Sequence, residues 1–147
     1  MKKTILLCAA ISLAALFLGG CGKRAVRGMQ DENFYLNRGM EHMKRKNYVE
    51  AIKDFQTVVD SYAGTSIVDK AQFMLAEAHY MNEDYVTAAY EYERVYDDFP
   101  SSAHAAEAWY KKAMCWYMES PKANLDQENT SLAVDEFRRY IQNFPYD

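Results

Sequence analysis

The chain repeats itself at an interval of 37 residues, and this self-similarity limits the possible fold more than any other feature. Small residues recur at that interval at Gly39, Ala76 and Ala113, in segments whose apolar periodicity indicates helices. The segments that follow carry Ala51 and Ala88, also 37 residues apart. Periods of this size are typical of stacked helical units, because one unit cannot bury its apolar face alone. We therefore expect helix pairs that cross closely at the small residues.

Bulky residues mark the second helix of each pair. Phe55 and Tyr92 lie 37 residues apart, and Phe137 follows 45 residues later, which indicates an eight-residue insertion in the third copy. We expect these rings to fill the space between neighbouring units. The predicted helices are residues 32–46, 48–62, 67–82, 84–99, 104–119 and 129–144.

Local signals support these helix boundaries. Proline lacks an amide donor and clashes with the preceding turn, so it ends the second helices at two places, Pro100 and Pro145. Asn47 with Glu50, and Ser66 with Asp69, have the spacing of reciprocal N-terminal caps. These four residues predict the starts of the second and third helices.

Composition favours a helical protein-binding module. Apolar residues make up 50% of the chain, and no run alternates apolar and polar residues long enough to predict a strand. The formal charge is −4, and it becomes −6 without residues 1–20, which contain Lys2 and Lys3 but no acid. Nucleic-acid binding needs a concentrated basic face, so this balance argues against it. We expect no nucleic-acid partner.

The first twenty residues have the features of a lipoprotein signal peptide. A basic start precedes a short apolar run, which ends in Leu18, Gly19, Gly20 and Cys21. These four residues resemble a bacterial lipobox, which implies cleavage before Cys21 and lipid attachment to its sulfur and amino group. An ordinary secretory signal with a chance cysteine is the alternative. With Cys8 removed in the signal and Cys21 lipidated, Cys115 would be the only free thiol, and we expect it to be a small buried hydrophobe.

The residue after the lipid-bearing cysteine implies the destination. In the lipoproteins that this segment resembles, an acidic residue there favours retention in the inner membrane, whereas this chain has Gly22. The resemblance therefore implies the outer membrane, with the protein lipid-anchored on its periplasmic face. Residues 21–31 are expected to form a lipidated tether.

The repeat columns resemble those of the tetratricopeptide repeat, a helix-turn-helix unit of about 34 residues. The resemblance implies an all-α fold, a right-handed α-solenoid of three helix pairs. Residues 32–65 would form repeat 1, residues 66–102 repeat 2 and residues 103–147 repeat 3, with the insertion at residues 120–129. In this family the first helices line a concave, peptide-binding face.

A candidate peptide-binding groove follows from the outward positions of the first helices. These positions are rich in methionine and aromatic residues, which can adapt to varied apolar peptides. The alternative is that these side chains are buried by packing between the copies. The predicted groove residues are Leu36, Met40, Met43, Phe73, Glu77, Tyr80, Met81, Tyr110, Met114, Tyr117 and Met118.

Catalytic and metal-binding signals are weak. His42 and His79 are 37 residues apart, so the repeat already accounts for them, and no metal-binding spacing accompanies them. His104 is expected to be exposed at a helix start. The sequence has no Gly-rich phosphate loop and no nucleophile elbow. We expect a protein that is not an enzyme, with no catalytic residue, no metal and no cofactor other than the covalent lipid on Cys21.

The insertion carries a more specific resemblance. Ser120 and Pro121, then Leu125, Asp126 and Gln127, resemble the third repeat of the BamD family, the lipoprotein component of the outer-membrane β-barrel assembly machinery. The resemblance implies a scaffold that acts in assembly and insertion of β-barrel proteins. Its implied partners are nascent outer-membrane proteins, the core barrel subunit and other assembly lipoproteins. A different periplasmic repeat lipoprotein, such as a secretin pilot or an envelope-organising adaptor, is the alternative.

The length departs from the family pattern. Members usually carry about five such repeats, whereas the sequence stops at Asp147, where a fourth first helix would begin. We expect either that the chain is truncated and corresponds to the N-terminal part of the family, or that its partner interface is reduced. Phe137 and Tyr140 would then be partly uncovered.

Overall fold

The fold consists of helices packed in pairs. The computed structural model describes residues 31–121 and 125–145, so the predicted signal peptide and most of the tether, Cys21 included, lie outside the described residues. No strand occurs in these two ranges. The helices are α2 (Glu32–Lys44), α3 (Tyr48–Ser61), α4 (Val68–Met81), α5 (Tyr85–Asp98), α6 (Ala105–Met118) and α7 (Glu128–Asn143). Each bound lies within two residues of its prediction.

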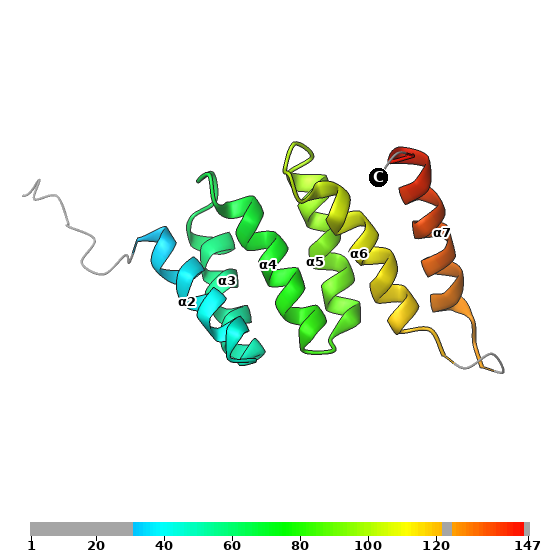
Figure 1. Ribbon diagram of the computed structural model, residues 1–147, viewed down its shortest axis with the longest axis horizontal. Helices are drawn as coiled ribbons and strands as arrows, with labels where there is room; N and C mark the ends of the chain where they lie inside the picture. Colours follow the sequence, from blue (N-terminus) through cyan, green and yellow to red (C-terminus); the bar gives the residue numbers. More distant parts are fainter. Residues whose placement is uncertain (1–30, 122–124, 146–147) are drawn as a thin grey trace, which may run out of the picture.

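The helices follow one another along the long axis of the molecule, from α2 at one end to α7 at the other (Figure 1). Each helix packs against the next one in chain order, both within a pair and between pairs. A stack in which the main contacts join helices that follow one another in the chain is typical of a solenoid. The prediction of an all-α solenoid of helix pairs is confirmed.

The turns within the first two pairs have the same backbone geometry. Lys46 has φ 60° and Glu83, 37 residues later, has φ 63°, which places both in the left-handed region. In the first turn the amide of Asn47 then donates to the carbonyl of His42 at 2.9 Å. The repeat therefore extends to an uncommon backbone conformation at equivalent non-glycine residues.

The cap predictions place one helix start correctly, but neither predicted side-chain cap forms. Asn47 is the N-cap residue of α3, but its side chain makes no capping hydrogen bond. Ser66 is not a cap, because Ile67 occupies the N-cap position of α4. Both predicted capping boxes are therefore wrong. A side-chain cap occurs instead at Asp84, whose carboxylate accepts from the amide of Thr87 at 3.3 Å at the start of α5.

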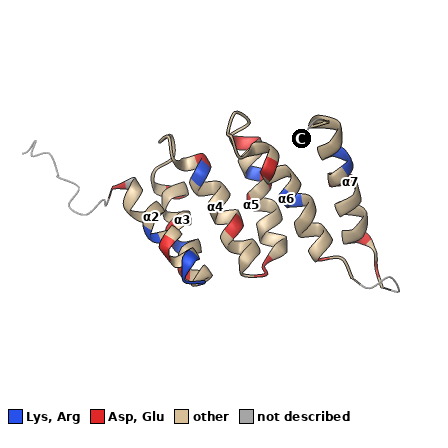
Figure 2. Ribbon diagram, in the orientation of Figure 1, with Lys and Arg blue, Asp and Glu red and all other residues tan. Residues whose placement is uncertain are grey.

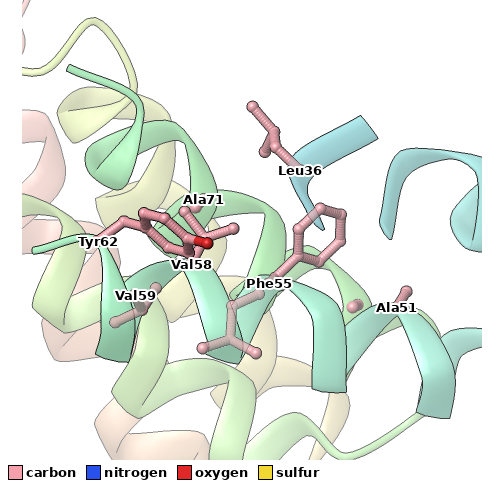
Figure 3. Close-up of a cluster of buried hydrophobic side chains, with 9 residues drawn as sticks. Leu36, Ala51, Phe55, Val58, Val59, Tyr62 and Ala71 are labelled. Carbon is pink, nitrogen blue, oxygen red and sulfur yellow. The ribbon is translucent and has the colours of Figure 1, made fainter. Parts of the chain in front are cut away.

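The first core cluster joins α2, α3 and α4 (Figure 3). Phe55 is completely buried at its centre, and Ala51 is equally buried one turn earlier. A Cβ atom added at Gly39 would lie 2.6 Å from Cε1 of the Phe55 ring. Only glycine therefore lets α2 approach this ring without a shift, which confirms the close crossing predicted at this position.

The second core cluster joins α4, α5 and α6. Tyr92 takes the place of Phe55 at its centre and is also completely buried. Cys115 lies in the same cluster, and burial raises the pKa of its thiol to about 12. A thiol with so high a pKa is an inert packing group at neutral pH, as predicted for Cys115.

Candidate protein-binding site

The N-terminal half of the predicted groove is largely part of the core. Leu36 and Phe73 are each only 6% exposed, and they belong to the two core clusters. Met40 and Met43 are half-buried against the first cluster. The expectation that Leu36 and Phe73 face outward is wrong, because the next helix in the stack covers the side of the first helix on which they lie.

Glu77 is committed to internal contacts. The hydroxyl of Tyr92 donates to its Oε1, and Nζ of Lys111 on the next first helix lies 2.9 Å from the same oxygen. Burial, followed by the negative charge of Glu77, raises the pKa of Tyr92. The carboxylate therefore accepts the hydrogen bond of a buried phenol, and it links repeat 2 to repeat 3.

Tyr80 and Tyr110 pack against neighbouring rings. Tyr80 is half-buried on the second core cluster, with the ring of Tyr85 at 5.2 Å, and burial raises its pKa. Tyr110 is partly exposed, but it contacts the rings of Phe137 and Tyr140 on α7 at 5.8 and 5.6 Å. Both side chains are therefore partly accessible to solvent and partly packed against other rings.

The most accessible predicted residues are Met81, Tyr117 and Met118. Their exposed fractions are 46%, 60% and 45%. Tyr117 and Met118 belong to one hollow of about 470 Å³ between the end of α6 and the start of α7, whereas Met114 on α6 is half-buried. We call this the α6–α7 hollow, and its lining residues are Tyr117, Met118, Ser120, Pro121, Gln127 and Thr130.

The described ends of the predicted insertion line the α6–α7 hollow, since Ser120, Pro121 and Gln127 belong to it. Hydrogen bonds hold both of these ends. Oγ of Ser120 donates to the carbonyl of Trp116 at 2.9 Å, and Nδ2 of Asn129 donates to that of Glu119 at 3.2 Å. The sequence marked the insertion as a sign of the family, but it gave no signal that both of its described ends contact the end of α6.

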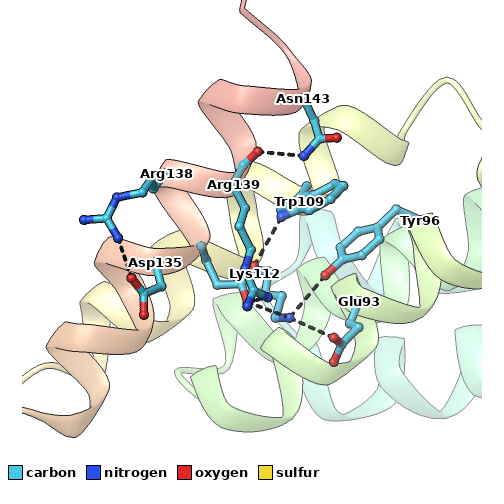
Figure 4. A network of polar contacts seen from close by, with 9 residues as sticks. Glu93, Tyr96, Trp109, Lys112, Asp135, Arg138, Arg139 and Asn143 are labelled. Atoms are coloured by element: carbon cyan, nitrogen blue, oxygen red, sulfur yellow. Dashed lines mark hydrogen bonds and ion pairs between the residues drawn. The ribbon is translucent and has the colours of Figure 1, made fainter.

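A polar network fixes α6 between α5 and α7 (Figure 4). Nζ of Lys112 lies 2.8 Å from Glu93 on α5 and 3.2 Å from Glu136 on α7, and it donates to the hydroxyl of Tyr96 at 3.2 Å. Burial alone would lower the pKa of Lys112, but the bonds to Glu93 and Tyr96 outweigh burial and raise it. Lys112 therefore stays charged and joins three helices, including both helices that flank the hollow.

The charges of the helices are mixed. Figure 2 shows basic and acidic residues interspersed along the described helices. All six side chains that line the α6–α7 hollow are uncharged. A lining of hydroxyl, amide and apolar groups suits an uncharged ligand better than a charged one.

Two of the three histidines, His42 and His79, contact a carboxylate within their own repeats. Nε2 of His42 lies 3.7 Å from Asp54, and Nδ1 of His79 lies 3.1 Å from Asp84. His104 is half-buried rather than exposed, because its ring stacks on Phe73 at 4.6 Å. Within residues 31–121 and 125–145, no group of three His, Cys, Asp or Glu side chains could hold a metal ion. In the same ranges, no helix is both long and apolar enough to span a bilayer.

The fold defines a helical-repeat protein built from stacked helix pairs. A family model described as YfiO, outer membrane lipoprotein, matches residues 27–147. The chain belongs to this family.

Curated relatives agree with the family match. The chain is 28% identical to outer membrane protein assembly factor BamD from Rickettsia prowazekii, over 99% of this chain and 58% of that protein. It is 27% identical to BamD from Caulobacter vibrioides, over 93% and 46%, and 23% identical to BamD from Pasteurella multocida, over 92% and 56%. The chain thus spans about half the length of the curated relatives it matches. These similarities confirm the resemblance to the N-terminal part of the BamD family.

Proposed function

We propose that the chain is a scaffold of the outer-membrane β-barrel assembly machinery. The observation that carries the proposal is the family match over residues 27–147, together with relatives that are named outer membrane protein assembly factors. The scaffold binds nascent outer-membrane proteins, the core barrel subunit and other assembly lipoproteins. Binding by a rigid stack of helices requires no catalytic group.

The proposed anchor is lipid on the sulfur and the new amino group of Cys21, with residues 1–20 removed by cleavage. A single acyl chain binds membranes only marginally, and each buried methylene adds about 0.8 kcal/mol, so several chains hold a protein stably. The anchored protein faces the periplasm from the outer membrane. Replacement of Cys21 by alanine is expected to remove the protein from the outer-membrane fraction.

The proposed peptide site is the α6–α7 hollow, extended by the accessible predicted residues around it. A barrel strand that alternates apolar and aromatic residues presents a row of rings on one face. Tyr117 offers an exposed ring, and Met118 an exposed thioether, to such a row. The neighbouring first-helix residues Tyr110 and Met114 extend the same apolar surface along α6.

A peptide-binding measurement tests the site. A labelled peptide copying the last strand of an outer-membrane barrel is titrated with the protein, followed by fluorescence anisotropy. Tyr117→Glu is expected to weaken binding about tenfold, the usual effect of losing a moderately important interface residue. The matched control is Tyr90→Glu on α5, because Tyr90 is 57% exposed, close to the 60% of Tyr117. Equal affinities for both variants would place the peptide site elsewhere.

The role in assembly has its own test. The lipidated protein is expressed with an affinity tag in cells that contain the assembly machinery, and the membrane extract is purified. Recovery of the core barrel subunit supports the scaffold role. Recovery of a secretin in its place would favour the pilot alternative.

A further inference from the structure

The helix ends form two edges of the stack, and one of these edges carries a group of aspartates. Because successive helices run in opposite directions, α2, α4 and α6 begin on the edge where α3 and α5 end (Figure 1). Asp60, Asp97 and Asp98 lie at the C-terminal ends of α3 and α5, and Asp69 lies in the first turn of α4. We call the surface formed by these four aspartates the acidic edge.

Most of the charge on the acidic edge is unfavourably placed. The C-terminal end of a helix carries a partial negative charge, which favours a cation in its last turn. Neither α3 nor α5 has a basic residue in its last turn, where Asp60, Asp97 and Asp98 stand instead. Among the described residues, the one ion pair of the acidic edge joins Asp98 to Nε of Arg94 at 3.6 Å, and the exposed side chain of Lys70 pairs with none of the four. A half-exposed pair is weak, so the edge favours a further cation.

A hollow of about 320 Å³ opens on the acidic edge, between the α3–α4 and α5–α6 loops. Asp69 and Asp98 line it, together with the hydroxyl residues Thr65, Ser101 and Ser102. Oγ of Ser102 donates to Asp69 at 2.7 Å, which ties the two loops together. Oγ1 of Thr65 is buried without a hydrogen-bond partner among the described residues, and an unpaired buried hydroxyl costs free energy. This acidic hollow therefore offers carboxylate and hydroxyl oxygens, which accept hydrogen bonds from an ammonium or guanidinium group.

The residues that precede α2 carry the opposite charge. Residues 21–30 contain Lys23, Arg24 and Arg27 and no acidic residue. They join the described chain at Asp31, the N-cap residue of α2, and therefore at the edge that carries the aspartates. A segment with three bases and no acid complements a surface of four aspartates.

The length of this segment fits the distance to the acidic hollow. Packed helix axes are about 8–10 Å apart, and α4 is the second helix after α2, so the hollow lies about 20 Å from the start of α2. An extended chain spans about 3.5 Å per residue, which gives a reach of about 28 Å from Asp31 to Lys23 and about 14 Å to Arg27. Lys23 and its neighbour Arg24 thus reach the hollow, whereas Arg27 reaches the end of α3.

We propose that the basic segment of residues 23–27 binds the acidic edge of its own chain, with Lys23 and Arg24 at the acidic hollow and Arg27 near Asp60. The contact fixes how the stack sits on its tether. With lipid on Cys21, it turns the acidic edge towards the membrane and the α6–α7 hollow, at the other ends of the helices, away from it. That orientation rests on the proposed anchor, whereas the contact itself does not.

Protection of Arg27 from an arginine-specific protease tests the contact. The chain, purified in nonionic detergent, is digested at about 0.1 M and about 1 M salt, between which the Debye length falls from about 10 Å to about 3 Å. Cleavage after Arg27 is expected to be about fivefold slower at low salt, the protection that a few exposed ion pairs give together. Asp97→Asn with Asp98→Asn should be cut at the fast rate at both salts. The matched control, Glu83→Gln with Glu128→Gln, removes two exposed charges from the opposite edge and should keep the protection.

An exchange of charges locates the contact. Lys23→Glu with Arg24→Glu should release the segment and speed cleavage after Arg27. Adding Asp97→Lys with Asp98→Lys should restore the protection, because the charges across the contact are then opposite again. No recovery in the combined variant would overturn the proposal, as would equal cleavage of the unchanged protein at both salts.

Anionic lipid head groups are the competing ligand for the basic segment. Phosphatidylglycerol added to the detergent micelles supplies them, and the digestion is repeated at low salt. Protection of Arg27 is expected without the lipid. Protection that appears only with phosphatidylglycerol, and that Asp97→Asn with Asp98→Asn leaves unchanged, would overturn the proposal by assigning the basic segment to the membrane surface.

Discussion

Repeats 1 and 2 solve the same packing problem with different chemistry. The residue at the centre of the core is Phe55 in repeat 1, and the first-helix residue at the corresponding column is Met40. In repeat 2 the ring is Tyr92, and the residue 37 positions after Met40 is Glu77, which accepts the hydrogen bond of the phenol. A buried hydroxyl without a partner is costly, so the two positions change together.

A second column shows the same compensation. In repeat 1 the second helix carries Asp54, and Nε of Arg38 on the first helix donates to Oδ2 of Asp54 at 2.8 Å. The equivalent acid in repeat 2 is Glu91, but Leu75 stands where Arg38 would be, and Nε2 of Gln72 donates to Glu91 at 2.7 Å. Both repeats therefore have a hydrogen bond between the first helix and the acid of the second helix, but in repeat 2 the donor lies about one helical turn earlier in the first helix.

Repeat 3 combines the two solutions. Its acid, Glu136, pairs with Lys112 at 3.2 Å, as the acid of repeat 1 pairs with an arginine. It also accepts from Nε1 of Trp109 at 3.2 Å, from the column that Gln72 uses in repeat 2. The repeats therefore conserve a polar crossing contact as a unit, and a variant that alters one member alone should be worse than one that alters both.

The largest effect is expected at Lys112. Lys112→Met leaves Glu136 buried without its main cationic partner, and breaking a buried pair in this way costs about 3 kcal/mol of unfolding free energy. Adding Glu136→Gln removes the orphaned charge and should recover most of the loss. Urea denaturation of the two variants measures both values. A single variant as stable as the double would show that the crossing contact is not a unit.

The next effect concerns the centre of repeat 2. Glu77→Met leaves the hydroxyl of Tyr92 without its acceptor, and we expect a loss of about 1–3 kcal/mol. Tyr92→Phe added to this variant installs the pair found in repeat 1 and should restore stability. Thermal unfolding followed by circular dichroism compares the three proteins. No recovery in the double variant would contradict the idea that the two positions change together.

A smaller loss of stability is expected to distinguish the N-terminus of α5 from that of α3. Asp84→Ala removes a side-chain cap from α5 and should cost about 1 kcal/mol. Asn47→Ala at the equivalent position of α3 is the matched control, since Asn47 makes no capping bond, and its cost should be clearly smaller. Urea midpoints of the two variants give the comparison, and equal losses would mean that Asn47 caps α3 in solution.

The same cap gives the smallest expected effect, a dependence on pH. Burial alone would raise the pKa of Asp84, but bonds from Thr87 and His79 outweigh it and lower the pKa. A lowered pKa in the folded state gives stability that is present above the ordinary aspartate value of about 4 and is lost as the pH falls through the folded-state pKa. Asp84→Asn should flatten this part of the stability profile, measured by urea midpoints between neutral and acid pH. An unchanged acid slope would remove Asp84 as its source.

The sequence could predict the helices because apolar spacing, small crossing residues and proline stops all act locally. It could not predict which first-helix residues stay accessible. A repeat interval shows that Leu36 and Phe73 occupy the same column, but it does not fix the rotation of that column relative to the next helix. The exposure of Tyr117 and Met118 depends on the path of the insertion, which is a tertiary property. The capping-box predictions were wrong because residue spacing alone does not fix the backbone geometry of the preceding loop, which decides which residue is the N-cap and whether its side chain can accept a hydrogen bond.

The positions of the tryptophans determine what an unfolding experiment followed by intrinsic fluorescence can detect. Both tryptophans of the chain, Trp109 and Trp116, lie on α6 and contact rings on α5, namely Tyr96 and Tyr90. Intrinsic fluorescence therefore reports the joint between repeats 2 and 3, whereas far-ultraviolet circular dichroism sums all helices. In a stack held by contacts between neighbours, repeat 1 can melt without changing the indole signal. The difference between the unfolding midpoint measured by fluorescence and the one measured by circular dichroism therefore reports how strongly repeat 1 is coupled to the other repeats.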